Sequence, residues 1–213
     1  MKKQKQSYMI QNKLIYIYIY TLIYIFINMP ILQRLVHYFF YYSYSFFSGT
    51  KIYELIFPAK DEVNHIVDNI YLGDYRIASH YSLLKELRLH HIINCTFEIP
   101  SEFPNDFSYL NISIEDSTSQ DITHSLDEAY SFLTQHVRDD NNNNNNNSRD
   151  NILVHCVQGK SRSASIVIYY LMKKYNYTYD RALELLRSKR SVVNPNKGFE
   201  RQLRQFEQIN FSI

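Results

Sequence analysis

The chain has 213 residues and a formal net charge of +2, with 23 lysines and arginines against 21 aspartates and glutamates. This length accommodates one domain with a full core plus an additional segment, and the small net charge, with no basic run interleaved with aromatic residues, excludes an extended nucleic-acid-binding surface. Two cysteines, neither in a CxxC pair, exclude a disulfide-rich scaffold and indicate a reducing, cytoplasmic environment.

The first 57 residues differ in composition from the rest of the chain. Ten of the 20 tyrosines precede residue 61, whereas three of the four glycines follow it. We therefore predict a boundary near Pro58. An apolar extension rich in tyrosine, isoleucine and phenylalanine would occupy 1–57, and a folded domain would occupy 58–210.

An uncharged apolar run from Leu14 to Ile27 is a candidate membrane anchor. A bilayer span needs about 20 mainly apolar residues, which 14–32 reaches only if a proline is tolerated. A single span preceded by cytosolic lysines would place the cysteines on the oxidising side of the membrane. Three alternatives remain: a two-segment hairpin, an interfacial anchor within residues 14–47 at the cytosolic face, or an extension without a function. We favour the last two. No small-residue cleavage site follows the run, which argues against a signal peptide.

From residue 62 the pattern is that of a compact α/β domain. Short apolar runs bounded by turn residues predict strands, and apolar residues at helical spacing predict helices. The expected strands are Val63–Val67, Ile70–Gly73, His91–Cys95 and Tyr109–Ile114, and the expected helices are Tyr81–Leu89 and Ser125–Arg138.

A polar tract follows the second of these helices. Three aspartates and seven consecutive asparagines lie within residues 139–150, and such a composition cannot bury enough apolar surface to fold. We predict a disordered insertion in a surface loop, which costs little stability because the entropy of loop closure grows slowly with length.

The segment from Ile152 to Lys173 predicts a strand, a tight loop and a helix. Backbone N–H groups of such a loop converge at a helix N-terminus, where they favour a dianion such as phosphate. The same field favours the nucleophilic thiolate form of Cys156. Arg162 supplies a planar fork that can bind two phosphate oxygens.

Two other interpretations of this loop compete with phosphate binding. Cys156 could be an ordinary buried cysteine at a strand end, because free cysteine is among the most buried residue types. Gly159-Lys160-Ser161 suggests an ATP-binding loop, but that motif needs a glycine where this chain has Val154.

The C-terminal part predicts two further helices. The first is expected at Thr178–Arg187, with its leucines facing inward. The run Asn194–Phe199 then breaks the chain and begins a last helix that extends through Phe206.

His155-Cys156, five residues and then Arg162-Ser163 together resemble the signature of the cysteine-based protein tyrosine phosphatases. The ending Gly159-x-Ser161-Arg162-Ser163 is most similar to the dual-specificity branch. Two weaker segments also resemble that branch, namely Asn69–Gly73 near the start of the domain and Pro195-Asn196-x-Gly198-Phe199 with Gln202-Leu203 near its end.

The resemblance implies a fold and a mechanism. The fold would be α/β, a mixed central sheet of about five strands with helices on both faces. In the family the cysteine attacks phosphorus to form a phosphocysteine, the arginine binds the phosphoryl oxygens, and the hydroxyl after the arginine assists the departing thiolate. These roles would fall to Cys156, Arg162 and Ser163. The phosphate would be bound by the loop residues Val157, Gln158, Gly159, Lys160, Ser161 and Arg162.

The family also needs a general acid from a strand end a few tens of residues before the cysteine, and Asp116 matches that position. This carboxyl group would protonate the leaving oxygen and later accept a proton from water. Glu115 and Asp121 are its rivals. An alternative without catalysis is that Asp116 or Asp121 caps the following helix.

Cys95 has two interpretations. It can be a small apolar residue in a buried strand. It can also be a redox partner of Cys156, because some relatives carry a resolving cysteine on the equivalent strand and form a protective disulfide.

We therefore expect a dual-specificity protein phosphatase that acts on phosphotyrosine and on phosphoserine or phosphothreonine in phosphoprotein substrates. No metal or organic cofactor is implied, and His90-His91 has no second ligand cluster at zinc-site spacing. A phosphoinositide phosphatase is the alternative suggested by Lys160 and the apolar N-terminus. An inactive phosphate-binding module is a further alternative, although it predicts loss of the cysteine, arginine or acid.

Overall fold

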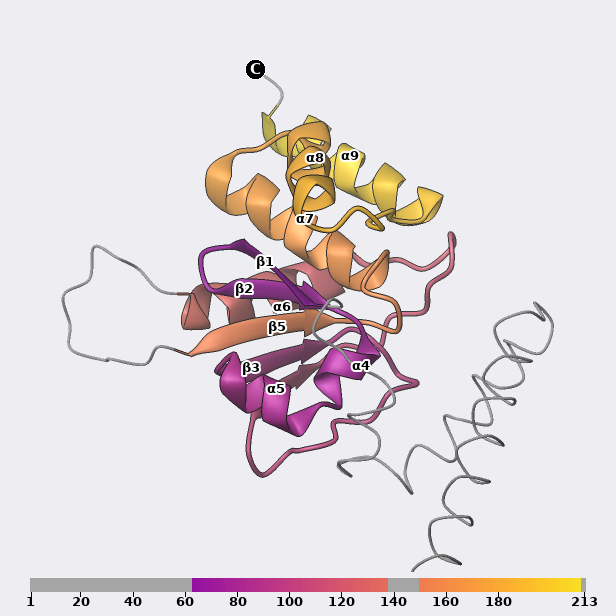
Figure 1. The fold of residues 1–213 in the computed structure, drawn as a ribbon. Helices are drawn as coiled ribbons and strands as arrows, with labels where there is room; N and C mark the ends of the chain where they lie inside the picture. The colour runs from indigo at the N-terminus through magenta and orange to yellow at the C-terminus, as the bar shows by residue number, and fades with distance from the viewer. Residues whose placement is uncertain (1–62, 138–149, 212–213) are drawn as a thin grey trace, which may run out of the picture. The chain divides into compact units, whose positions relative to one another are not determined.

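The computed structural model describes residues 63–137 and 150–211 (Figure 1). The predicted extension at 1–57 lies outside the described residues, and so does the asparagine tract except for Asp150. A five-stranded sheet forms the centre of the described part. Its strands are β1 (Val63–Val67), β2 (Ile70–Gly73), β3 (Leu89–Asn94), β4 (Ser108–Asn111) and β5 (Asn151–His155).

The sheet has the order β1-β2-β5-β3-β4. β1 is antiparallel to β2, whereas β2, β5, β3 and β4 are parallel to one another. Gly73 and Asn94 are both paired with His155, and Asn94 is also paired with Asn111. The four parallel strands therefore end at one edge of the sheet, where ligands bind in open α/β folds.

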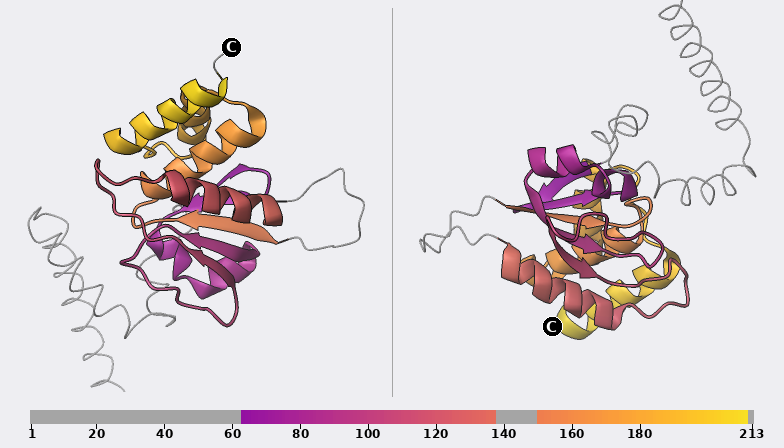
Figure 2. Two further views of the ribbon diagram at one scale, coloured as in Figure 1. Left: turned by 180° about the vertical axis from the view of Figure 1, so that it is seen from behind. Right: turned by 90° about the horizontal axis from the view of Figure 1, so that it is seen from below.

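Helices cover both faces of the sheet (Figures 1 and 2). Two short helices pack on one face, and four longer helices contribute to the core on the other. The first pair is α4 (Tyr75–Ala78) and α5 (Tyr81–Glu86), and the second group is α6 (Thr123–His136), α7 (Arg162–Tyr175), α8 (Tyr179–Lys189) and α9 (Lys197–Phe211). The predicted mixed α/β sheet with helices on both faces is confirmed.

Several predicted boundaries were wrong, and α4 was not predicted. The helix expected at Tyr81–Leu89 ends at Glu86, because Arg88 takes a positive φ of 52° and Leu89 already begins β3. The strand expected at Tyr109–Ile114 ends at Asn111. Beyond it, Ile112 and Ile114 still alternate into the core, so their apolar spacing reflects burial without strand pairing.

α7 lies in the centre of the larger core. Every residue from Arg162 to Met172 is buried, as expected for a helix that is apolar nearly all round. None of the helices in ranges 63–137 and 150–211 combines the length and the apolar character required to cross a membrane.

The C-terminal end of α7 is attached to the turn between β1 and β2 through Asp68. The Asp68 carboxylate accepts hydrogen bonds from the hydroxyls of Tyr170 and Tyr175, each at 2.6 Å, and from Lys174 at 3.1 Å. Burial alone would raise the pKa of Asp68, but these three donors outweigh it and hold the pKa below its ordinary value of 3.8.

Asp68→Asn should destabilise the domain in a pH-dependent way. Because the native pKa is lowered, the carboxylate stabilises the fold above pH 3.8 and loses this contribution as the pH falls through the native pKa. We expect a loss of about 1–3 kcal/mol in the free energy of unfolding at pH 7. Urea denaturation of both proteins at pH 7 and in steps below pH 4 measures this difference. A difference that stays constant with pH would contradict the role given to Asp68.

Candidate active site

Cys156 follows β5 at the edge where the parallel strands end. Residues 156–161 connect β5 to α7 and form what we call the phosphate loop. β2 ends at the same edge, and the loops that follow β3 and β4 begin there. The last residue of β2, Gly73, lies against the phosphate loop, and the two loops supply Glu98 and Asp116, which contact Arg162 and the phosphate loop respectively.

The backbone of the phosphate loop is held in one conformation. Gly159 has a φ of +62°, and a Cβ at this position would lie 2.5 Å from the carbonyl oxygen of Gly73, so only glycine fits. Arg190, only 5% exposed, donates from Nε to the carbonyl of Gly159 at 3.0 Å and from Nη2 to that of Gln158 at 3.1 Å. Its Nη1 binds Asn64 on β1. Arg190 therefore connects the loop to the far strand of the sheet.

Two donors point at the sulfur of Cys156. The backbone N–H of Gly159 and the hydroxyl of Ser163 each lie 3.2 Å from Sγ. Donors in these positions can hydrogen-bond to a thiolate, which is the nucleophilic form of cysteine. Burial lowers the pKa of the preceding His155 to about 4, and the Arg162 charge acts in the same direction. His155 is therefore neutral at pH 7, and the positive charge near the sulfur comes from Arg162.

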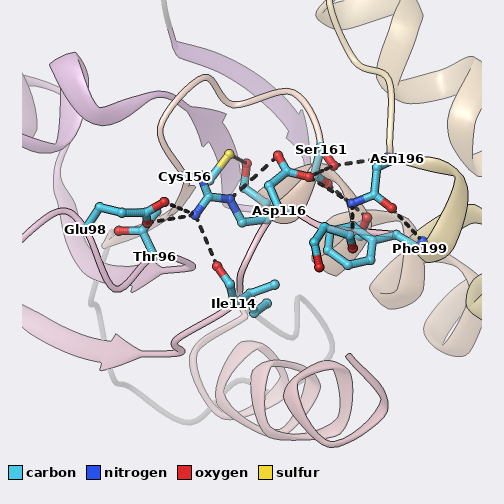
Figure 3. Close-up of polar contacts among 12 residues, drawn as sticks. Thr96, Glu98, Ile114, Asp116, Cys156, Ser161, Asn196 and Phe199 are labelled. Atoms are coloured by element: carbon cyan, nitrogen blue, oxygen red, sulfur yellow. Dashed lines mark hydrogen bonds and ion pairs between the residues drawn. The ribbon is translucent and has the colours of Figure 1, made fainter. Parts of the chain in front are cut away.

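The guanidinium of Arg162 makes hydrogen bonds through Nη1, whereas its Nε makes only a longer ion pair of 3.7 Å with Asp116. Glu98, Ile114 and Asp116, its three partners, are labelled in Figure 3. Its Nη1 donates to both oxygens of Glu98, at 3.0 and 2.8 Å, and to the carbonyl of Ile114 at 3.1 Å. Its Nε is buried and makes no hydrogen bond to any described residue. The edge formed by Nε and Nη2 thus makes no hydrogen bond to a described residue, and such an edge has the geometry for bidentate phosphate binding.

The segment that carries Glu98 is stabilised by its own hydrogen bonds. The side chain of Asn94 accepts from the hydroxyl of Thr96 at 2.7 Å and donates to the carbonyl of Ile99 at 2.7 Å. The Thr96 hydroxyl in turn accepts from the N–H of Ile99 at 3.1 Å. Glu98 therefore projects from a short, closed loop, which limits the positions open to its carboxylate.

The carboxylate of Asp116 lies against the phosphate loop (Figure 3). Its Oδ1 accepts from the hydroxyl of Ser161 at 2.7 Å and from the side-chain amide of Asn196 at 2.9 Å, and its Oδ2 is 3.7 Å from Nε of Arg162. Of its rivals, Glu115 is exposed, and Asp121 accepts from the N–H of Thr123 at the start of α6. Asp121 therefore binds the first N–H of α6 from the position before the N-cap residue Ile122, which makes no side-chain cap hydrogen bond.

The N-terminus of α7 lies where the sequence predicted an anion site. Ser161 occupies the N-cap position, but its hydroxyl is turned to Asp116 and makes no cap hydrogen bond. The first N–H groups of the helix consequently remain available to a ligand. Gln158 and Lys160 have exposed side chains, and Val157 is half-buried. Phosphate binding by the backbone of these residues stays a prediction.

Cys95 lies directly after β3, beside the start of the phosphate loop. Its N–H donates to the carbonyl of His155 at 2.9 Å, and its side chain is fully buried. Burial raises the pKa of Cys95 well above its ordinary value, and the neighbouring Cys156 adds to this effect. Both cysteines are free thiols, and pairing between them stays a prediction.

Three contributors to this site were not found from the sequence, namely Glu98, Arg190 and Asn196. Asn196 belongs to the Pro195–Phe199 segment, which the sequence marks as a break before the last helix and as part of the family resemblance, but without a role at the site. A polar residue beside a proline break was a usable signal. Glu98 and Arg190 are single charged residues without a motif. Among the residues that the structure describes, no group of three or more His, Cys, Asp or Glu side chains could hold a metal ion.

Comparison with known proteins agrees with this geometry. Residues 70–209 match the family model described as "Dual specificity phosphatase, catalytic domain". Over 146 residues the chain is 35% identical to Dual specificity protein phosphatase 1B of Arabidopsis thaliana. The aligned residues are 68% of this chain and 82% of that protein. It is 38% identical to Protein phosphatase Slingshot homolog 1 of Homo sapiens over 155 residues, which are 73% of this chain but only 14% of that protein.

A solved structure shows the same fold at moderate sequence identity. The Yvh1 phosphatase domain from Chaetomium thermophilum matches with a TM-score of 0.59 and 29% identity. The match covers 70% of this chain and 98% of that one.

Glu98→Gln should weaken phosphate binding more than it slows turnover. The amide loses the charge-assisted bonds that fix Nη1 of Arg162, so the free edge is no longer held toward the ligand. We expect KM for 4-nitrophenyl phosphate to rise about fivefold to twentyfold, a loss that corresponds to weakening one or two hydrogen bonds to a charged group. Steady-state kinetics measure this effect.

Glu86→Gln is the matched control, because Glu86 is exposed on α5. An unchanged KM in Glu98→Gln, or an equal rise in Glu86→Gln, would contradict the role given to Glu98.

Proposed function

This chain belongs to the dual-specificity phosphatase family and is a dual-specificity protein phosphatase, and we propose that it acts through a phosphocysteine formed on Cys156. The observation that carries the proposal is the position of the Cys156 sulfur. It receives two hydrogen bonds at the N-terminus of α7, in the loop that leads to Arg162, whose Nε makes no hydrogen bond to a described residue.

In the first step, the thiolate of Cys156 attacks phosphorus. A sulfur–phosphorus bond forms while the bond from phosphorus to the leaving oxygen breaks. Arg162 binds two phosphoryl oxygens through Nε and Nη2, and the loop N–H groups bind the others. Asp116 donates a proton to the leaving oxygen, so that an alcohol or phenol departs instead of an alkoxide or phenolate.

In the second step, water attacks the phosphocysteine. The carboxylate of Asp116 accepts the proton from this water, the sulfur–phosphorus bond breaks, and inorganic phosphate is released. The hydroxyl of Ser163, 3.2 Å from Sγ, donates a hydrogen bond to the departing thiolate. No step requires a metal or an organic cofactor.

The substrates are phosphoproteins, as the names of the relatives imply. Activity on phosphotyrosine as well as on phosphoserine or phosphothreonine follows from family membership. We propose that the protein acts in a reducing, cytoplasmic compartment, because a free nucleophilic thiol must persist there. Association with the cytosolic face of a membrane through residues 14–47 belongs to the same proposal.

We also propose that Cys95 protects Cys156 from irreversible oxidation. Peroxide would convert the Cys156 thiolate to a sulfenic acid, and the thiol of Cys95 would attack that sulfur to form a disulfide and release water. Mass spectrometry after graded peroxide treatment should show a peptide that links the two cysteines. Oxidation of Cys156 to the sulfinic acid without such a link would contradict the proposal.

Cys156→Ser should abolish hydrolysis, and Asp116→Ala should slow the hydrolysis of aryl phosphates by about 10²–10⁴. Turnover of phosphotyrosine, phosphothreonine and phosphoinositide substrates by reduced protein, with these two variants beside it, measures both effects.

Activity that survives in Cys156→Ser would contradict the phosphocysteine. Near-normal turnover in Asp116→Ala would remove Asp116 from the mechanism, and a preference for the lipid would favour the phosphoinositide alternative.

A further inference from the structure

The loop that carries Asp116 has little structure of its own. Residues 115–122, here called the acid loop, contain no strand or helix, and most of their side chains are exposed. Within the loop the backbone hydrogen bonds run from Ser117 to Glu115 at 2.9 Å and from Gln120 to Ser117 at 3.4 Å. A segment with so few internal contacts needs contacts from elsewhere to keep one conformation.

The first turns of α9 supply those contacts. Asn196, just before the helix, donates to Asp116 at 2.9 Å and to the carbonyl of Ser117 at 3.3 Å. Gly198 lies so close to the loop that a Cβ there would collide with the carbonyl oxygen of Thr118. The helix therefore packs directly against the middle of the acid loop.

Gln202 holds the far end of the loop. Its Oε1 accepts from the N–H of Ile122 at 2.9 Å, and its Nε2 donates to the carbonyl of Gln120 at 2.8 Å. Gly198 and Gln202 are four residues apart, so they lie on the same face of α9. Because one amide group binds both a donor and an acceptor of the loop backbone, it fixes that backbone in orientation as well as in position.

We propose that Gln202 is a positioning residue for proton transfer, which keeps the acid loop in the conformation that holds Asp116 at the phosphate loop. This inference rests on the proposed function, because it assumes that Asp116 is the general acid. It predicts a specific dependence on substrate. A good leaving group such as 4-nitrophenolate departs with little help from an acid, whereas phenolate or an alkoxide requires the proton.

The test compares kcat/KM for phenyl phosphate with kcat/KM for 4-nitrophenyl phosphate in the full chain, because kcat/KM reports only the steps up to formation of the phosphocysteine, before Asp116 acts on water. For Gln202→Ala we expect kcat/KM on phenyl phosphate to fall about tenfold, because small displacements of a catalytic group have effects of this size or larger. The kcat/KM on 4-nitrophenyl phosphate should change less than twofold. Gln202→Glu, which can accept from Ile122 but cannot donate to Gln120, should give an intermediate loss on phenyl phosphate.

Two further variants make the result specific. Gln205→Ala, on the same helix but with an exposed side chain, should leave both rates unchanged. In the double variant Gln202→Ala, Asp116→Asn, the loss on phenyl phosphate should equal that of Asp116→Asn alone, because both changes act on the same proton transfer.

Equal losses on both substrates in Gln202→Ala, or additive losses in the double variant, would overturn the positioning role and leave Gln202 with a structural role only. Failure of the proposed function has a different signature, in which Asp116→Asn itself shows no dependence on the leaving group. That result would overturn the assignment of Asp116 and, with it, the role given to Gln202.

Discussion

The site depends on a buried guanidinium whose two sides have different partners. Arg162 is only 4% exposed, and a buried charge is costly unless it is paired and hydrogen-bonded. Glu98 and the carbonyl of Ile114 meet that requirement at Nη1, while Nε stays without a hydrogen bond to the described residues. The arginine is therefore compensated enough to be stable in the fold and still lacks the acceptors that a phosphate dianion would supply. In the planar guanidinium of Arg162, Nη1 therefore stabilises the fold, and the edge formed by Nε and Nη2 is the one that can bind a ligand.

This division requires side chains that lie far apart in the sequence. Glu98 follows β3, Asp116 follows β4 and Cys156 follows β5, and they meet because these strands are parallel and end at one edge. An antiparallel arrangement would send alternate loops to opposite edges. The parallel register is in turn covered on both faces by helices, so the packing of the core determines the alignment of the loops.

The sequence predicts the parts of the site that are local and misses those that are not. The strand before Cys156, the turn at Gly159 and the helix after Arg162 follow from apolar runs and glycine punctuation within about 20 residues, and each is present. The contacts of Glu98 and Arg190 cross 64 and 31 residues respectively, and a single charged residue has no periodicity to mark it. The segment Asn196 to Gln202 shows a third case. The turn residues of this segment are visible in the sequence. The hydrogen bonds that the segment makes to the acid loop, about 80 residues away, are not.

The two ends of α7 explain how the phosphate loop keeps its geometry. The N-terminal end carries Arg162 and the free N–H groups, and the C-terminal turn carries Lys173 and Lys174, which complement the negative end of the helix dipole. These lysines are bound by Asp127 on α6 and by Asp68 on the turn before β2. The helix is therefore attached at its far end to two separate elements, and its middle is buried on all sides. The acid loop is held instead by hydrogen bonds from Ser161 of the phosphate loop and from Asn196 and Gln202 at the start of α9. Within one active site, the group that binds phosphate is thus fixed by the core, whereas the position of the proton donor depends on a few hydrogen bonds between loops and the start of one helix.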